Sequence, residues 1–245
     1  MKLFTFISLT LISGAIAGAL LGLINQGIVE PFIDKAIGIE MQREISTGKI
    51  VDSTQQSQYR MWQKEGEIVA ATIMGMSLAS LFGVVFAYSR NSLPLLDNKR
   101  KALTLAGLMF FVLFLVPALK YPANPPAVGN PSTIYYRENL FIGFIAVSGF
   151  STLALALLYR RLGNNDRLKM KIAVSLIYAA IMIAAYLVFP SNPDRITIQT
   201  DLIISFRIAS VFTMGVFWGL LGITFGTFWD KFKPHETSKE IATSV

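Results

Sequence analysis

Six long apolar runs, separated by polar or basic segments, set the pattern of this sequence. A helix needs about 20 residues to cross a hydrocarbon core of ~30 Å, and each run approaches or exceeds that length. The pattern therefore predicts an all-α integral membrane protein, a bundle of six transmembrane helices in a single domain over residues 1–234. The predicted spans are 3–29, 66–88, 102–119, 140–158, 172–188 and 208–228.

Small residues recur at intervals of four along two of the predicted spans. This spacing lines one helix face with small side chains, so that a neighbouring backbone can approach closely in lipid. We therefore expect tight packing of these helices on sister helices, with a homo-oligomer through the same faces as a further expectation. The residues concerned are Gly14, Gly18 and Gly22 in the first span, and Ala71, Gly75, Ala79 and Gly83 in the second.

The first apolar run opens like a secretory signal peptide, with Lys2 as the basic end and Ala15-Ile16-Ala17 as a small-residue cleavage site. The run continues for a dozen residues past that site, which favours an uncleaved span that ends near Pro31. The polar segment 32–65 contains no run that could span a bilayer. We expect a short amphipathic helix over residues 37–45 and a flexible connection over residues 53–57.

A near repeat divides the second half of the chain. Tyr121-Pro122-Ala123-Asn124-Pro125 closes the third run, and Phe189-Pro190-Ser191-Asn192-Pro193 closes the fifth run 68 residues later. Proline stops a helix because it lacks a backbone donor and fixes φ. An arginine follows each copy, Arg137 or Arg207, before the next apolar run. We interpret the two units as a duplicated helical hairpin, with chance similarity as the alternative because three of five positions are identical.

Composition supports the membrane assignment: hydrophobic residues make up 53% of the chain, charged residues 15%, and the mean hydropathy is +0.53. Soluble domains carry about a quarter charged residues. The net charge of +7 does not indicate nucleic-acid binding, because the basic residues lie in loops beside the spans. With no cysteine, the chain has neither a disulfide framework nor a thiolate metal site.

Basic residues predict the orientation in the cell membrane, since lysine and arginine favour the cytoplasmic side. They concentrate in the second loop, residues 90–101, and in the fourth loop, residues 160–171. These loops are therefore expected on the cytoplasmic side, together with both termini and a short tail over residues 235–245. The two Pro-x-Asn-Pro loops then face outward.

Several strings in this order resemble the CbtA family of predicted cobalt transporter subunits. They are Pro117-Ala118-Leu119 before the proline-rich loop, Phe206-Arg207-Ile208-Ala209-Ser210, and Phe217-Trp218-Gly219-Leu220-Leu221-Gly222. The resemblance runs from the first span to Trp229. It implies uptake of cobalt(II) across the cell membrane, as transported ion rather than cofactor, together with CbtB, a small single-span subunit bearing histidines.

One position departs from the family pattern. Many relatives place a histidine three residues before Pro-Ala-Leu, where this chain has Phe114. Imidazole and carboxylate are the ligands that cobalt(II) favours. The single histidine, His235, lies in the tail, where we interpret it as a solvated residue without a second ligand beside it.

Acidic residues gather at the predicted outer ends of the spans, where they form a hypothetical vestibule that attracts cations. The metal-site candidates are Glu30, Asp34, Glu67, Glu138 and Asp201, with Glu65 and Asp194 on the same side. Arg137 and Arg207 are candidate exchangeable counter-ions. The alternative is that these acids are interfacial charges paired with Arg137, Arg195 and Arg207. Methionines 74, 76, 109 and 214 are interpreted as packing residues rather than soft ligands.

No enzyme signature accompanies these features: the sequence contains neither a Gly-Lys-Ser/Thr phosphate loop nor His-Glu-x-x-His. The predicted function is a permease component for a divalent transition-metal cation. The alternative is a membrane assembly or scaffold protein without a transport path. A permease should bring polar residues together between its helices, whereas a scaffold should have a dry bundle.

Overall fold

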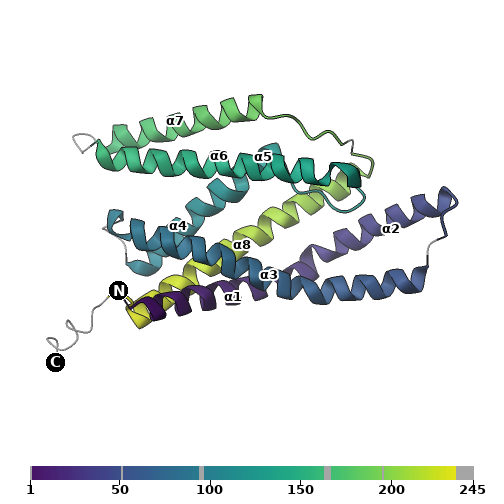
Figure 1. The fold of residues 1–245 in the computed structure, drawn as a ribbon, viewed down its shortest axis with the longest axis horizontal. Coiled ribbons are helices and arrows are strands. Elements are labelled where there is room, and N and C mark those ends of the chain that lie inside the picture. Colours follow the sequence, from purple (N-terminus) through teal and green to yellow (C-terminus); the bar gives the residue numbers. More distant parts are fainter. Residues whose placement is uncertain (1, 51, 94–96, 163–166, 195, 236–245) are drawn as a thin grey trace.

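The computed structural model describes residues 2–50, 52–93, 97–162, 167–194 and 196–235, which form helices joined by turns and loops (Figure 1). The α-helices are α1 (Leu3–Ile28), α2 (Glu30–Ser46), α3 (Ser53–Ser89), α4 (Asn98–Phe110), α5 (Val116–Lys120), α6 (Ile134–Arg161), α7 (Arg167–Val188) and α8 (Thr200–Phe232). A π-helical turn, Phe111–Leu115, joins α4 to α5. Six helical segments are long and apolar enough to cross a membrane, which confirms the predicted fold class.

The helix ends correct the prediction in the polar first loop. Residues 53–57, predicted as a flexible connection, are instead the first turns of α3, because the Asp52 carboxylate accepts hydrogen bonds from the N–H groups of Thr54 and Gln55. With 37 residues, α3 is about 55 Å long, well beyond the ~30 Å of a hydrocarbon core. The amphipathic helix expected over residues 37–45 is also longer and is α2. Pro31 lies in the first turn of α2, and α1 ends at Ile28, three residues before the proline near which its end was predicted.

Helices α1, α3, α4 and α8 form the main bundle, and small residues interlock their backbones. A Cβ on Gly14 would lie 2.5 Å from the Gly75 carbonyl oxygen, and one on Gly226 would lie 2.7 Å from the Lys99 Cα. The glycine ladder of α1 thus packs on α3 within the chain and is not free for a second copy. Aromatic side chains fill the rest of this core, including Phe82, Phe86, Phe225 and Trp229.

The α6–α7 hairpin lies apart from this bundle, along the upper edge of Figure 1. Helix α6 packs on α7, and it meets the rest of the chain mainly at the π-helical turn and α5. In the most apolar window of α7, 6% of the residues are buried, compared with 44% in α1. The hairpin is therefore a thinly attached second unit.

Both ends of the described chain meet at one end of the bundle, where the Lys2 N–H donates to the Pro234 carbonyl. The basic loops lie there too: the Arg90 guanidinium stacks over Trp229 at 5.4 Å, and Arg160 stacks over Tyr88 at 4.6 Å. His235 is not a solvated tail residue as we had interpreted it, since its ring stacks on Trp229 at 6.0 Å. The remainder of the tail, residues 236–245, lies outside the described residues.

The two proline-rich loops meet at the opposite end. The Tyr121 hydroxyl donates to the Pro190 carbonyl at 2.6 Å, and the rings of Tyr121 and Phe189 both pack edge-on against Phe144. The two copies of the motif thus lie side by side at one end of the molecule. Helix α7 packs on α6, whereas α8 packs on α4 and α1. The duplication of a helical hairpin stays a prediction.

Candidate functional site

The first turns of α2 and the N-terminal part of α3 carry a cluster of opposite charges. Glu30 and Asp34 lie one turn apart on α2, and Arg60 and Lys64 lie one turn apart on α3. The Arg60 guanidinium lies 2.5 Å from Glu30 Oε2 and 2.9 Å from Asp34 Oδ1, and Lys64 Nζ lies 2.7 Å from Asp34 Oδ2. This cluster, which we call the outer charge cluster after the side that the sequence predicts for it, joins two helices through ion pairs.

The two acids of the cluster differ in how far their side chains are exposed. The Glu30 side chain is 8% exposed, and the Arg60 side chain that pairs with it is 14% exposed, whereas the Asp34 side chain is 48% exposed. Partial burial would raise the pKa of Asp34, but the hydrogen bonds from Lys64 and Arg60 outweigh it and hold this pKa below its ordinary value. Asp34 is thus placed to stay ionised.

Glu67 adds a third acid on α3, at the edge of the same cluster. Its carboxylate lies beside the Asn25 amide and within electrostatic range of Glu30 and Arg60. The Oε2 atom of Glu67 is buried and has no hydrogen-bond partner. Three carboxylates here face two cationic side chains, so the cluster has an excess of negative charge when all of them are ionised.

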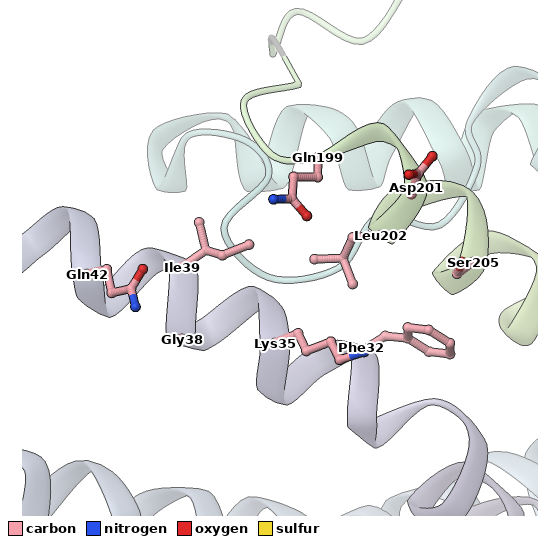
Figure 2. A pocket seen from close by; sticks show the side chains of 9 residues that line it. All are labelled: Phe32, Lys35, Gly38, Ile39, Gln42, Gln199, Asp201, Leu202 and Ser205. Carbon is pink, nitrogen blue, oxygen red and sulfur yellow. The ribbon is translucent and has the colours of Figure 1, made fainter.

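The remaining predicted acids are scattered over the outer end. Glu138, in the second turn of α6, and Glu65, on α3, are exposed and form no ion pair in the described part of the chain. Asp201 lines a cavity of about 470 Å³ between α2 and the start of α8 (Figure 2). This cavity is bordered by Phe32, Lys35, Gly38, Ile39, Gln42, Gln199, Asp201, Leu202 and Ser205. Glu138 and Asp201 thus do not join the cluster around Glu30.

Of the two candidate counter-ions, Arg137 pairs with an acid as the alternative interpretation expected, and Arg207 binds a loop. Arg137 Nε lies 2.9 Å from Asp194 Oδ2, so Arg137 neutralises an acid of the α7–α8 loop rather than Glu67 or Glu138. Arg207 donates to the Asn124 side-chain oxygen at 2.7 Å and to the Ala123 carbonyl at 3.3 Å. Arg195, the third cation considered for these acids, lies outside the described residues.

A second polar group lies among the spans, at the π-helical turn. The Ser148 hydroxyl of α6 donates to the Val112 carbonyl at 2.6 Å, and it lies 2.8 Å from the Tyr178 hydroxyl of α7. Other hydroxyls of the spans, such as those of Thr10 and Ser13, bond to a carbonyl of their own helix. The Ser148 hydroxyl thus forms hydrogen bonds between helices.

None of these groups is a ready-made metal cage. Among the residues that the structure describes, no three His, Cys, Asp or Glu side chains are arranged to hold a metal ion. The cluster can attract a cation through its field when its three carboxylates are ionised, because an excess of negative charge raises the local cation concentration. Met109 belongs to the main hydrophobic core, in agreement with a packing role.

A comparison with family models gives one match that covers most of the chain. The model described as "Probable cobalt transporter subunit (CbtA)" matches residues 3–230. The chain belongs to the CbtA family. No curated protein and no solved structure matched the sequence.

Membership of the CbtA family agrees with six membrane-spanning helices and with a subunit that works alongside another component. The family is one of transporter subunits, which indicates a role other than catalysis. Phe114, where the family resemblance led us to expect histidine, lies in the π-helical turn and stacks on Phe110 at 5.7 Å. An aromatic pair therefore occupies the position where histidine was expected.

Sequence reasoning missed the cations of the outer charge cluster. Arg60 and Lys64 are 30 residues from their partners Glu30 and Asp34. A signal was nevertheless present, because both pairs have the four-residue spacing that places side chains on one helix face. Reading residues 53–65 as part of a helix would have revealed it.

Proposed function

We propose that this chain is a membrane permease component for the uptake of a divalent transition-metal cation, cobalt(II) in the first place. The observation that carries the proposal is the CbtA family match over residues 3–230. A small single-span subunit of the CbtB type is its proposed partner. Both termini are assigned to the cytoplasm, because the basic loops lie at the same end of the bundle as Lys2 and Pro234.

The outer charge cluster is the proposed place where the cation is first attracted. Glu67 is its central residue, since its Oε2 atom is buried without a partner and no ion pair neutralises it in the described structure. Glu30 and Asp34 contribute charge that Arg60 and Lys64 partly offset. Glu138 and Asp201 add to the negative potential of the same end from a distance.

A scaffold without a transport path is the competing proposal. In its favour, the main bundle is dry: its core consists of aliphatic and aromatic side chains such as Leu221, Phe225 and Trp229. Against it stands the polar group of Ser148, Tyr178 and the Val112 carbonyl, which lies between helices at the edge of that bundle. The polar contact favours the permease.

Metal accumulation tests the proposal directly. Cells that produce this chain, alone and with its single-span partner, should accumulate more cobalt than cells without it, as measured by elemental analysis at matched membrane abundance. Glu67→Gln should lower accumulation several-fold, since it removes charge and keeps shape, whereas Glu138→Gln should lower it less. Accumulation equal to the empty cells, with and without the partner, would contradict the permease. Unchanged accumulation in Glu67→Gln would contradict only the cluster.

Orientation has its own test, for which the absence of native cysteine is convenient. Ala123 lies exposed in the first proline-rich loop, whereas Ala127 in the same loop is half-buried and has φ +67°. A thiol in Ala123→Cys should react with an impermeant maleimide added to intact cells. Reaction only after the cells are opened would place this loop inside and reverse the assigned orientation.

A further inference from the structure

The boundary between the α6–α7 hairpin and the main bundle is built differently from the contacts inside the bundle. Inside, glycine faces bring backbones together, so that a Cβ on Gly14 or Gly75 would overlap a carbonyl of the facing helix. At the boundary, a Cβ on Gly149 would meet Leu113 at an ordinary 3.5 Å. Interlocked backbones cannot slide without separating, whereas side chains in ordinary contact can exchange neighbours.

Polar contacts follow this boundary into the span. The Ser148 hydroxyl links α6 to the carbonyl of Val112 and to Tyr178 on α7. Val112 belongs to the π-helical turn, which interrupts the span between α4 and α5. Single π turns inside α-helices occur frequently at functional sites. Hydroxyl and carbonyl groups can also be hydrated when helices part, unlike the aliphatic core of the bundle.

At the end of the molecule that carries the proline-rich loops, two arginines bind the loops that connect the hairpin to the bundle. Arg137 on α6 pairs with Asp194 in the α7–α8 loop, and the Thr133 hydroxyl donates to the same carboxylate at 2.7 Å. The Asp194 side chain is 8% exposed, and a Cβ on Gly129 would lie 2.7 Å from its Oδ2 atom. Gly129 has φ +102°, so the backbone wraps closely over this ion pair.

The second arginine makes the reciprocal contact. Arg207 on α8 of the bundle donates to Asn124, in the loop that leads into α6. Each copy of the repeated unit thus supplies an arginine that binds the loop of the other copy. We call Arg137, Asp194, Arg207 and Asn124 the outer clasp.

We propose that the α6–α7 hairpin parts from the main bundle along the line of Ser148, Tyr178 and the Val112 carbonyl, and that the outer clasp holds this boundary closed until it opens to water. This inference deepens the proposed function, since it names the boundary at which a transport path opens. Its test measures thiol labelling rather than metal uptake, so either conclusion can fail while the other stands.

Two buried serines provide matched reporters. Ser148 at the boundary and Ser13 inside the bundle are both 0% exposed, and both hydroxyls donate to a backbone carbonyl. Ser148→Cys and Ser13→Cys each introduce one thiol into a chain without cysteine. Labelling by N-ethylmaleimide in membranes reports access to water, because the thiolate is the reactive form.

The clasp is then opened in each reporter. Asp194→Asn removes the charge that Arg137 binds, and adding Arg207→Leu removes the second tie. We expect labelling of Ser148→Cys to rise several-fold in the single variant and further in the double variant, with labelling of Ser13→Cys unchanged. Asn98→Ala, which removes the 2.8 Å hydrogen bond to Asp230 at the inner end, is the control that should change neither reporter.

Two outcomes would overturn the proposal. One is slow, unchanged labelling of Ser148→Cys in folded clasp variants. The other is an equal rise at both reporters, which would mean general loosening rather than parting at this boundary. If Asp194→Asn lowers membrane abundance, Thr133→Val provides a milder opening, and it must raise Ser148→Cys labelling selectively for the proposal to stand.

Discussion

The helices of the main bundle and those of the α6–α7 hairpin associate through different kinds of contact. Lipid tails are as apolar as leucine, so burial from water does not drive helices together, and close packing and hydrogen bonds must do so. In the bundle, α1 and α3 meet through glycine and alanine, with facing backbones in contact. The hairpin is held by ordinary side-chain contacts, the hydroxyl group at Ser148 and the outer clasp.

The two kinds of contact differ in how much displacement of the helices they allow. Helices whose backbones touch cannot be displaced without a clash. This suits a rigid bundle that keeps both ends of the described chain and the basic loops together. Hydrogen bonds and ion pairs can be exchanged for water at small net cost, which suits a boundary that opens. Substitutions of matched residues in the two units test this difference.

The largest effect is expected at the glycine faces. Gly18→Ala would force its Cβ against the Ala71 carbonyl oxygen, whereas Gly149→Ala finds ordinary space beside Leu113. We expect Gly18→Ala to lower the free energy of unfolding by about 3 kcal/mol or more. Gly149→Ala should be neutral or stabilising by up to ~1 kcal/mol, because alanine favours the helix. Reversible unfolding in mixed micelles measures both, and equal losses would erase the distinction between the units.

Charge gives the second test, because ion pairs join α2 to α3. Arg60→Gln leaves the buried Glu30 carboxylate with Lys64 at 3.8 Å, so we expect a loss of about 3 kcal/mol in unfolding free energy. The matched control is Lys49→Gln, which removes the exposed pair with Glu44 and should have no measurable effect. A harmless Arg60→Gln would show that the outer charge cluster is not a structural joint.

A smaller difference is expected between two serine-to-alanine changes. Ser148→Ala leaves the Val112 carbonyl and the Tyr178 hydroxyl without this partner, which should cost about 1–2 kcal/mol of unfolding free energy. Ser13→Ala removes a bond within one helix turn, to Leu9, and should cost well under ~1 kcal/mol. If Ser13→Ala were the more harmful change, the hydroxyl group would not be what holds the hairpin.

The smallest effect concerns pH. The pKa of Asp34 is held below its ordinary value of 3.8, so its ion pairs stabilise the folded chain above that value. The contribution is lost as the pH falls below about 4, through the lower pKa of the folded state. Thermal unfolding of the parent between pH 7 and pH 3 should therefore show a small acid step that Asp34→Asn lacks. An identical step in that variant would assign it to another carboxyl.

How much of this could be predicted from sequence depends on the length scale of each feature. The four-residue spacing of Gly14, Gly18 and Gly22 predicted close packing, because spacing along one helix defines a face. It could not show whether that face meets α3 or a second copy, since the partner is a matter of tertiary structure. The proline motifs likewise predicted where helices end but not that the two loops touch.

The candidate site was predicted less well, because it is made by contacts between distant residues. The acids Glu30, Asp34 and Glu67 were singled out, and the structure brings them together. Their cations were missed when residues 53–57 were interpreted as a connection, although Asp52 has the residue type of a helix N-cap. The pairing of Arg137 with Asp194 spans 57 residues, and no local pattern encodes it.

The hydrogen bond from Lys2 to Pro234 carries a consequence for engineering the chain. Residues 2 and 234 lie close enough to be joined by a short linker, with new ends opened in a loop elsewhere, because surface positions tolerate circular permutation. New ends placed in the first proline-rich loop would turn the covalent link between α5 and α6 into a noncovalent one. The hairpin would then be joined to the bundle through the α7–α8 loop alone, and α6 could be labelled or tethered at its new free end.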